Sequence, residues 1–179
     1  MRSPVASHKA MSRISLEDGL TAFQCSESKG VFLPVASYFR WLAKQPERLP
    51  HLPVNENQSE IPSVDTSNVK ICPESGQIMI RYKVGHDFSF YLDRSPSGSV
   101  WFDFGEWDAI RSRQFHDELH LIFTASWQNS VRTLEQRKAE ALILKNRLGD
   151  ELMVRLTDLK ESLSDHSYRD MALAYLHKK

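Results

Sequence analysis

Alternating apolar and polar positions predict a β-hairpin in the middle of the chain. Residues 88–93 read Phe-Ser-Phe-Tyr-Leu-Asp, and this two-residue period is typical of a half-buried strand. An earlier strand-like run ends near Tyr82, and Gly85-His86-Asp87 favours a turn between the two runs. Short turn segments open at Cys72-Pro73 and Ser95-Pro96, so that a turn flanks the hairpin on each side.

Helical spacing follows the hairpin. Asp103 and Glu106 are three residues apart, as in a helix N-terminal pair in which one side chain accepts from the first turn and the other reaches back. Apolar residues between Trp107 and Phe123 then recur at helical intervals. They predict one helical face that continues to about Ala125.

A weaker copy of the same pattern comes earlier, over residues 16–42. The aligned pairs are Cys25 with Ser95, Phe32 with Trp101, and Tyr38 with Trp107. This self-similarity predicts an internal duplication. Residues 45–70 lie between the copies and hold four of the chain's eight prolines among polar residues, which favours an extended linker.

The longest helical pattern covers residues 130–164. Five leucines recur there at spacings of four, four, three and four, namely Leu148, Leu152, Leu156, Leu159 and Leu163. A leucine seam of this kind has to be buried, either against the chain's own helices or against a second copy. Gly149 weakens a helix by about 1 kcal/mol relative to Ala, or it marks a break between two helices. A short final helix is expected near residues 168–176.

The composition is that of a soluble globular protein, with 41% hydrophobic and 26% charged residues and a net charge of zero. The whole-chain balance therefore gives no sign of polyanion binding. No window approaches the run of about 18 apolar residues that spans a membrane, and residues 1–11 have no apolar core of a signal peptide. Two cysteines provide no disulfide framework. We expect a cytoplasmic protein without membrane contact.

Two motifs carry a family resemblance. They are Cys72-Pro-Glu-Ser75-Gly, and Asp93-Arg-Ser95-Pro-Ser-Gly-Ser-Val-Trp101-Phe-Asp-Phe-Gly-Glu106. The second resembles the Asp-Arg-Cys-Pro-x-Cys-Gly-Gly-x-Trp-Leu-Asp-x-Gly-Glu-Leu pattern of the bacterial transcription-factor-IIB-like zinc finger family. The match covers residues 71–107 well and residues 16–42 weakly. The resemblance implies a zinc ribbon, in which two turns each give two thiolates to one tetrahedral metal ion.

Most of the metal-ligand positions of that family hold other residues here. Only Cys72, and Cys25 in the earlier copy, are thiols, whereas Ser75 and Ser95 replace cysteines. A serine hydroxyl stays protonated near neutral pH and lacks the charge and softness of a thiolate. Because a structural zinc contributes about 10–16 kcal/mol in finger peptides, a ribbon without zinc needs another source of stability. We expect dense aromatic packing to supply it, from Phe23, Phe32, Phe39, Trp41, Phe88, Phe90, Trp101 and Phe102.

These patterns together predict an α+β fold. Two degenerate zinc-ribbon-like copies are expected at residues 1–44 and 71–112, with a proline-rich linker at 45–70. Residues 113–179 are expected to be helical and to form a helical hairpin or a coiled coil through the leucine seam.

One pair of histidines suggests metal chemistry. His116 and His120 are four residues apart, which on a helix places both on one face, as in zinc peptidases. Asp117 and Leu119 occupy the places where those peptidases have their glutamate. The alternative is two polar residues on a solvated or interfacial face. Cys25 and Cys72 are residual metal candidates, although a cysteine is more often a small buried hydrophobe.

A basic segment at the start of the long helix suggests a nucleic-acid contact. Its cations are Arg132, Arg137, Lys138, Lys145 and Arg147, with Glu135 and Glu140 between them. Interleaved charges more often form a solvated face, and counterion release needs several unopposed cations. The sequence therefore predicts a non-catalytic interaction or scaffold module that binds another protein, is a homodimer, and takes no cofactor. The alternatives are a nucleic-acid-binding regulator and a metal-dependent enzyme that uses His116 and His120.

Overall fold

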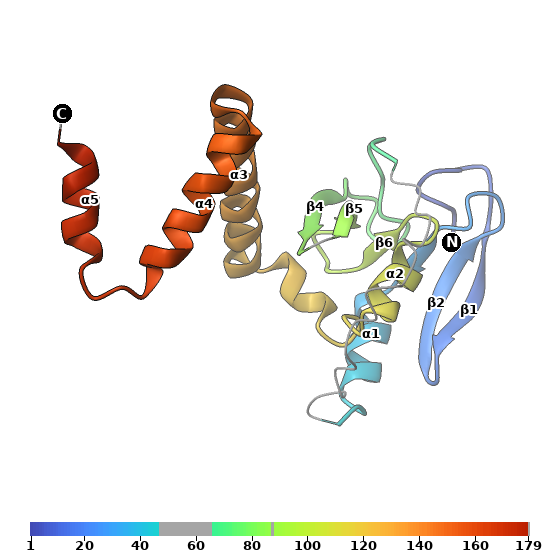
Figure 1. Cartoon of the computed structure of the whole chain (residues 1–179). Helices are drawn as coiled ribbons and strands as arrows, with labels where there is room; N and C mark the ends of the chain where they lie inside the picture. The colour runs from blue at the N-terminus through green and yellow to red at the C-terminus, as the bar shows by residue number, and fades with distance from the viewer. Residues whose placement is uncertain (47–65, 87, 179) are drawn as a thin grey trace. The chain divides into compact units, whose positions relative to one another are not determined.

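The computed structural model describes residues 1–46, 66–86 and 88–178 and has an α+β fold (Figure 1). The chain divides into two compact units, Met1–Val131 and Arg132–Lys179. The first unit holds a six-stranded antiparallel sheet, and the second is helical. The predicted α+β class is confirmed. Within the described ranges, no helix has the length and apolar character needed to cross a membrane.

The first unit contains two successive sets of three strands and a helix (Figure 1). The first set is β1 (Met11–Glu17), β2 (Leu20–Cys25), β3 (Val31–Leu33) and α1 (Val35–Leu42), and the second is β4 (Ile80–Gly85), β5 (Phe88–Arg94), β6 (Val100–Phe102) and α2 (Glu106–Ser112). The strand order is β1-β2-β3-β6-β5-β4. The two sets therefore meet at the centre of the sheet, through β3 and β6.

The centre of the sheet has a local two-fold symmetry. Phe32 of β3 lies directly opposite Trp101 of β6, and these are residues that the sequence comparison aligned. Outside the named strands, Arg2 bridges to Ala10 and Ile71 bridges to Ile78, so a short bridge precedes each set. From either edge to the centre of the sheet, the chain therefore forms a bridge and then three antiparallel strands.

Apolar side chains cover both faces of the sheet. On one face the helices pack over a large cluster that includes Leu33, Phe90 and Phe102. On the other face a smaller cluster surrounds Phe32 and Trp101. The expected aromatic core is largely present, since six of the eight aromatic residues named above are buried, Phe23 is partly buried, and Phe39 is 49% exposed.

The predicted helical face from Trp107 to Ala125 is wrong, because α2 ends at Ser112. The amides of Gln114 and Phe115 donate to the carbonyls of Arg111 and Ile110, with Gln114 at a φ of 56°. This is the Schellman pattern that closes a helix. The chain then forms a 3₁₀ turn, η1 (Leu119–Phe123), before α3 (Ala125–Leu148) begins.

Much of the predicted linker, residues 47–65, lies outside the described residues. The part that is described, residues 66–70, runs next to β4, because the Met79 amide donates to the Lys70 carbonyl and Arg81 donates to the Thr66 carbonyl over 2.8 Å. The end of the linker is therefore fixed to the sheet.

The second unit contains the rest of α3, then α4 (Asp150–Ser164) and α5 (Arg169–His177). Gly149 separates α3 from α4 at a φ of 79°, so the second of the two alternatives for this glycine holds. Residues 150–177 include no buried side chain in either helix. The apolar side chains of α4 and α5 are therefore exposed or only partly buried.

Candidate functional site

Four short turns have a shared geometry, and we call them the knuckle turns. They begin at Ser3, Cys25, Cys72 and Ser95, each of which is buried. In every one, the side chain at the first position accepts from backbone amides two or three residues later, over 3.2–3.4 Å for the two serines. These hydrogen bonds satisfy backbone amides within each turn.

The knuckle turns lie in pairs. The hydroxyls of Ser3 and Ser28 hydrogen-bond to the Cys25 thiol, so the first pair joins the Ser3 and Cys25 turns. In the second pair the Ser75 and Ser95 hydroxyls hydrogen-bond to the Cys72 thiol. Each pair therefore encloses one thiol together with hydroxyl groups.

The two thiols are acidified but inaccessible. Burial by itself raises a thiol pKa, but hydrogen bonds from the neighbouring serine hydroxyls and backbone amides outweigh it, so the pKa of both Cys25 and Cys72 is lowered. Cys25 is 0% and Cys72 is 1% exposed, and both are reduced. The lower pKa favours a thiolate, whereas burial keeps reagents away from it.

The donor set does not suit a zinc ion. Zinc in a structural site takes four ligands, mostly thiolates and imidazoles, and each pair of knuckle turns offers one thiol. In the part of the chain that the structure describes, no three His, Cys, Asp or Glu side chains are placed to hold a metal ion. The sheet face between the pairs is filled by Phe32 and Trp101, and a Cβ at Gly30 would lie 2.2 Å from the Trp101 ring.

A buried charge cluster lies beside the second pair. The Lys70 side chain is 0% exposed, and its Nζ is 2.7 Å from Asp93 Oδ2 and 3.3 Å from Asp103 Oδ2. Lys70 also donates to the Thr66 carbonyl over 2.8 Å, and Trp101 Nε1 donates to Asp103 Oδ1 over 2.7 Å. Burial raises the pKa of the Asp93 carboxyl, which the hydrogen bond from Lys70 partly offsets.

The predicted helix N-terminal pair is right for Glu106 and wrong for Asp103. Glu106 Oε2 reaches back and accepts from the Asp103 amide over 2.7 Å. The N-cap of α2 is Gly105, however, with no side-chain cap. Asp103 binds Trp101 and Lys70 in place of the first helical turn, because a buried cation and an indole N–H compete for its oxygens. The sequence comparison did not single out Lys70, since a lone lysine at the end of a polar linker gives no signal of burial.

The structure contradicts the assumption that His116 and His120 share a helical face. His116 lies in a bend before η1, 7% exposed, and its ring contacts those of Trp41 and Trp107. His120 lies in η1, where its Nδ1 is 3.1 Å from the Tyr38 hydroxyl. The helix ends earlier because of the Schellman closure at Gln114, so the four-residue spacing no longer places the two rings together.

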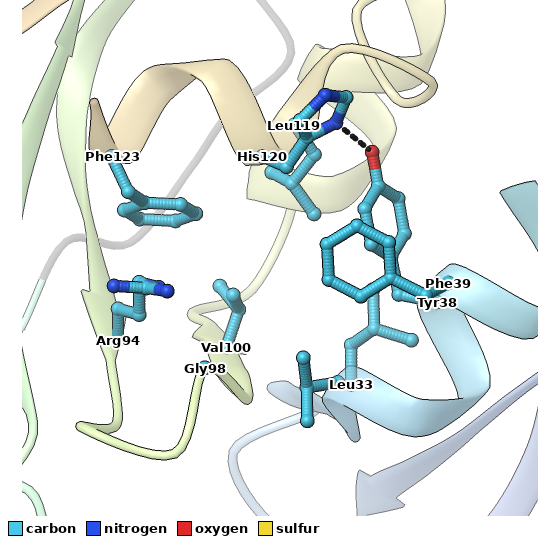
Figure 2. Close-up of a pocket in the computed structure, with 10 residues that line it drawn as sticks. Leu33, Tyr38, Phe39, Arg94, Gly98, Val100, Leu119, His120 and Phe123 are labelled. Carbon is cyan, nitrogen blue, oxygen red and sulfur yellow. Dashed lines mark hydrogen bonds between the residues drawn. The ribbon is translucent and has the colours of Figure 1, made fainter.

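A small recess opens on the helix-bearing face of the sheet (Figure 2). It is lined by Leu33, Val35, Tyr38, Phe39, Arg94, Gly98, Val100, Leu119, His120 and Phe123. Tyr38 donates to the Asp117 carbonyl over 2.8 Å, and burial raises the pKa of the Tyr38 hydroxyl far above its ordinary value. The Tyr38 hydroxyl also lies within hydrogen-bond distance of His120 Nδ1.

Three exposed isoleucines lie at the start of β4 and in the segment before it, and we call them the isoleucine patch (Ile71, Ile78 and Ile80). Their side chains are 46%, 62% and 51% exposed. Ile71 bridges to Ile78, and Ile80 lies opposite Arg94 in the β4–β5 register. Cross-strand neighbours and alternate residues share a face of a sheet, so the patch and the recess are on the same face.

The residues predicted to form the leucine seam and the nucleic-acid contact are exposed, apart from Leu163. Leu148, Leu152, Leu156 and Leu159 are 39–44% exposed and Leu163 is partly buried. Arg132, Arg137, Lys138, Lys145 and Arg147 are all on exposed positions of α3, and Lys145 forms an ion pair with Asp150 over 3.2 Å.

A groove between α4 and α5 continues the leucine seam. It is lined by Leu159, Leu163, His166, Tyr168, Met171, Ala172, Tyr175 and Leu176 and has a volume of about 480 Å³.

Comparison of the chain with protein-family models, with curated proteins and with solved structures finds no match.

Proposed function

We propose that this chain is a metal-free relative of zinc ribbons that serves as a non-catalytic protein-interaction module. The ribbon ancestry is supported by the knuckle turns, whose first positions accept backbone amides and which lie in two pairs. It is also supported by the symmetric strand order, which an internal duplication would produce. Hydrogen bonds and the Lys70 cluster then take the place of the metal.

The isoleucine patch carries the proposal of a protein partner. The corresponding positions of the first set are Arg2, Ala10 and Ser12, because the Arg2–Ala10 bridge matches the Ile71–Ile78 bridge. The fold therefore does not need aliphatic side chains at these places. Contiguous exposed apolar patches mark interaction sites, whereas singly scattered apolar residues do not.

Photo-cross-linking tests the proposed partner contact. A benzoylphenylalanine placed at Ile80 should give a discrete cross-linked protein adduct in cells. The same group at Ser12, which holds the equivalent place in the first set, should give none. Equal adduct patterns at the two positions, or none at either, would reject the proposal.

Restoring the lost ligands tests the ribbon ancestry. Ser3→Cys, Ala6→Cys and Ser28→Cys complete two Cys-x-x-Cys turns around Cys25. We expect this variant to bind cobalt with the absorption bands of a tetrahedral thiolate site. The control adds Cys25→Ser, which should weaken binding at least tenfold. Equal binding by the two variants would argue against a ribbon geometry.

The part of the leucine seam that lies on α4, Leu152 to Leu163, supports a second contact, with another copy of the chain, as the sequence predicts. A soluble helix that keeps an apolar stripe needs a partner to cover it. Leu156→Asp should then lower the mass measured by sedimentation to that of one chain. Val154→Asp, on the opposite side of α4 and 59% exposed, should leave the dimer intact. A wild-type protein that sediments as one chain would reject this contact.

The basic residues of α3 keep nucleic-acid binding as the alternative function. Binding that weakens steeply with salt and depends on Arg137 and Lys138 would favour it. Metal-dependent catalysis has less support, because His116 and His120 do not share the helical face on which that hypothesis depended.

A further inference from the structure

Arg94 holds an unbalanced charge in an apolar setting. It is half-buried, and its guanidinium lies 5.2 Å from the centre of the Phe123 ring (Figure 2). No carboxylate or hydrogen-bond acceptor among the described residues pairs with it, and none of the residues that line the recess is acidic. Because a partly desolvated cation without a counter-charge is costly, an anion would be favoured at this place.

The size of the recess limits what the anion can be. It leaves about 30 Å³ open to water-sized groups, and one water needs about 10–15 Å³ by that measure. The space therefore suits a group of two or three heavy atoms, such as a carboxylate, and excludes a nucleotide or a sugar. A planar guanidinium is matched to a carboxylate, which it binds through two hydrogen bonds.

Apolar surface lies on both sides of the recess. Phe39 is 49% exposed on the α1 side, and Ile80 of the isoleucine patch is 51% exposed on the β4 side, opposite Arg94 in the strand register. A free small acid would leave these side chains in water. A peptide that carries a carboxylate between apolar residues would place the carboxylate on Arg94 and its apolar residues on Phe39 and Ile80.

The first set of strands provides an internal comparison. The Ile80–Arg94 pair of the second set corresponds to the Ser12–Gln24 pair of the first. Gln24 is neutral and donates to the Lys29 carbonyl over 3.2 Å. The cation and the aliphatic residue thus occur together in the second set and are both missing from the first, although the backbone is equivalent.

We propose that the recess beside Arg94 binds a carboxylate of the protein partner, with apolar residues of that partner lying on Phe39 and on the isoleucine patch. This inference rests on the proposed function and names the chemistry of the partner: an acidic residue flanked by apolar ones. Arg94 supplies the positive charge, and Phe39 and the isoleucine patch supply the apolar contact area.

NMR titration with sodium propionate tests the recess directly. We expect saturable shifts at the amides of Gly98, Val100 and His120, and none with propionamide, which has the same shape without the charge. Arg94→Gln, which installs the residue of the first set, should weaken propionate binding at least tenfold while the rest of the spectrum is unchanged. Arg94→Lys should bind with intermediate affinity. Unsaturable shifts, or equal binding by Arg94→Gln, would overturn the inference.

The two proposals fail separately. If the cross-link at Ile80 forms equally in wild-type and Arg94→Gln protein, the chain has a partner but the carboxylate contact is wrong. If propionate binds through Arg94 and no cross-link forms, the recess is an anion site and the proposed protein partner is wrong.

Discussion

Lys70 is the side chain whose loss should damage the fold most directly. Its Nζ contacts Asp93, Asp103 and the Thr66 carbonyl, and no part of the side chain reaches solvent. Lys70→Met keeps the length of the side chain and removes the charge. Asp93 and Asp103 then lose their buried cation, while Arg81 still attracts Asp93 and Thr66 still donates hydrogen bonds to Asp103. Removal of one partner of a buried ion pair costs about 3–5 kcal/mol.

The chain is well suited to measuring this loss. All four tryptophans lie in the first unit, so their fluorescence during urea unfolding reports on the unit that holds Lys70. We expect the free energy of unfolding to fall by about 3–5 kcal/mol for Lys70→Met. Lys44→Met, at an exposed position, should change it by less than about 0.5 kcal/mol.

A compensating change separates charge from packing. Adding Asp93→Asn to Lys70→Met removes one of the stranded carboxylates, so the double variant should recover part of the lost stability. The reasoning is refuted if Lys70→Met costs less than about 1 kcal/mol, or if Asp93→Asn costs as much in the Lys70→Met background as it does alone.

Two further predictions concern the sheet face that carries the knuckle turns. Gly30→Ala should lower the free energy of unfolding by about 1–3 kcal/mol, because its Cβ would lie 2.2 Å from the buried Trp101 ring. Ser26→Ala, at an exposed position nearby in the chain, should change it by less than about 0.5 kcal/mol in the same urea titration. The thiols of Cys25 and Cys72 should react with a thiol reagent only as fast as the first unit unfolds, because access limits them in spite of their lowered pKa; fast reaction of the native protein would contradict the packing described.

The sequence predicted the regular elements better than the contacts. Period-two alternation located β5, and the alignment of Phe32 with Trp101 anticipated two residues that face each other at the centre of the sheet. These features are local, or follow from comparing the chain with itself. The helix after Trp107 was overextended, because apolar spacing does not show where a left-handed residue such as Gln114 closes a helix.

The candidate site depends on contacts between distant residues. Lys70 is buried only because Asp93 and Asp103 lie beside it in the folded sheet, and nothing in the linker composition indicates this. The recess joins Phe39 of α1 to Arg94 of β5 and His120 of η1. Sequence spacing predicted neither, since both arise from tertiary packing.

The central claim is that the knuckle turns hold their fold without metal, and native mass spectrometry tests it most directly. The account predicts a spectrum in which each folded chain has the mass of its amino acids alone, with or without prior treatment with a chelator. A stoichiometric zinc on each chain, lost together with the folded charge states when a chelator is added, would contradict it.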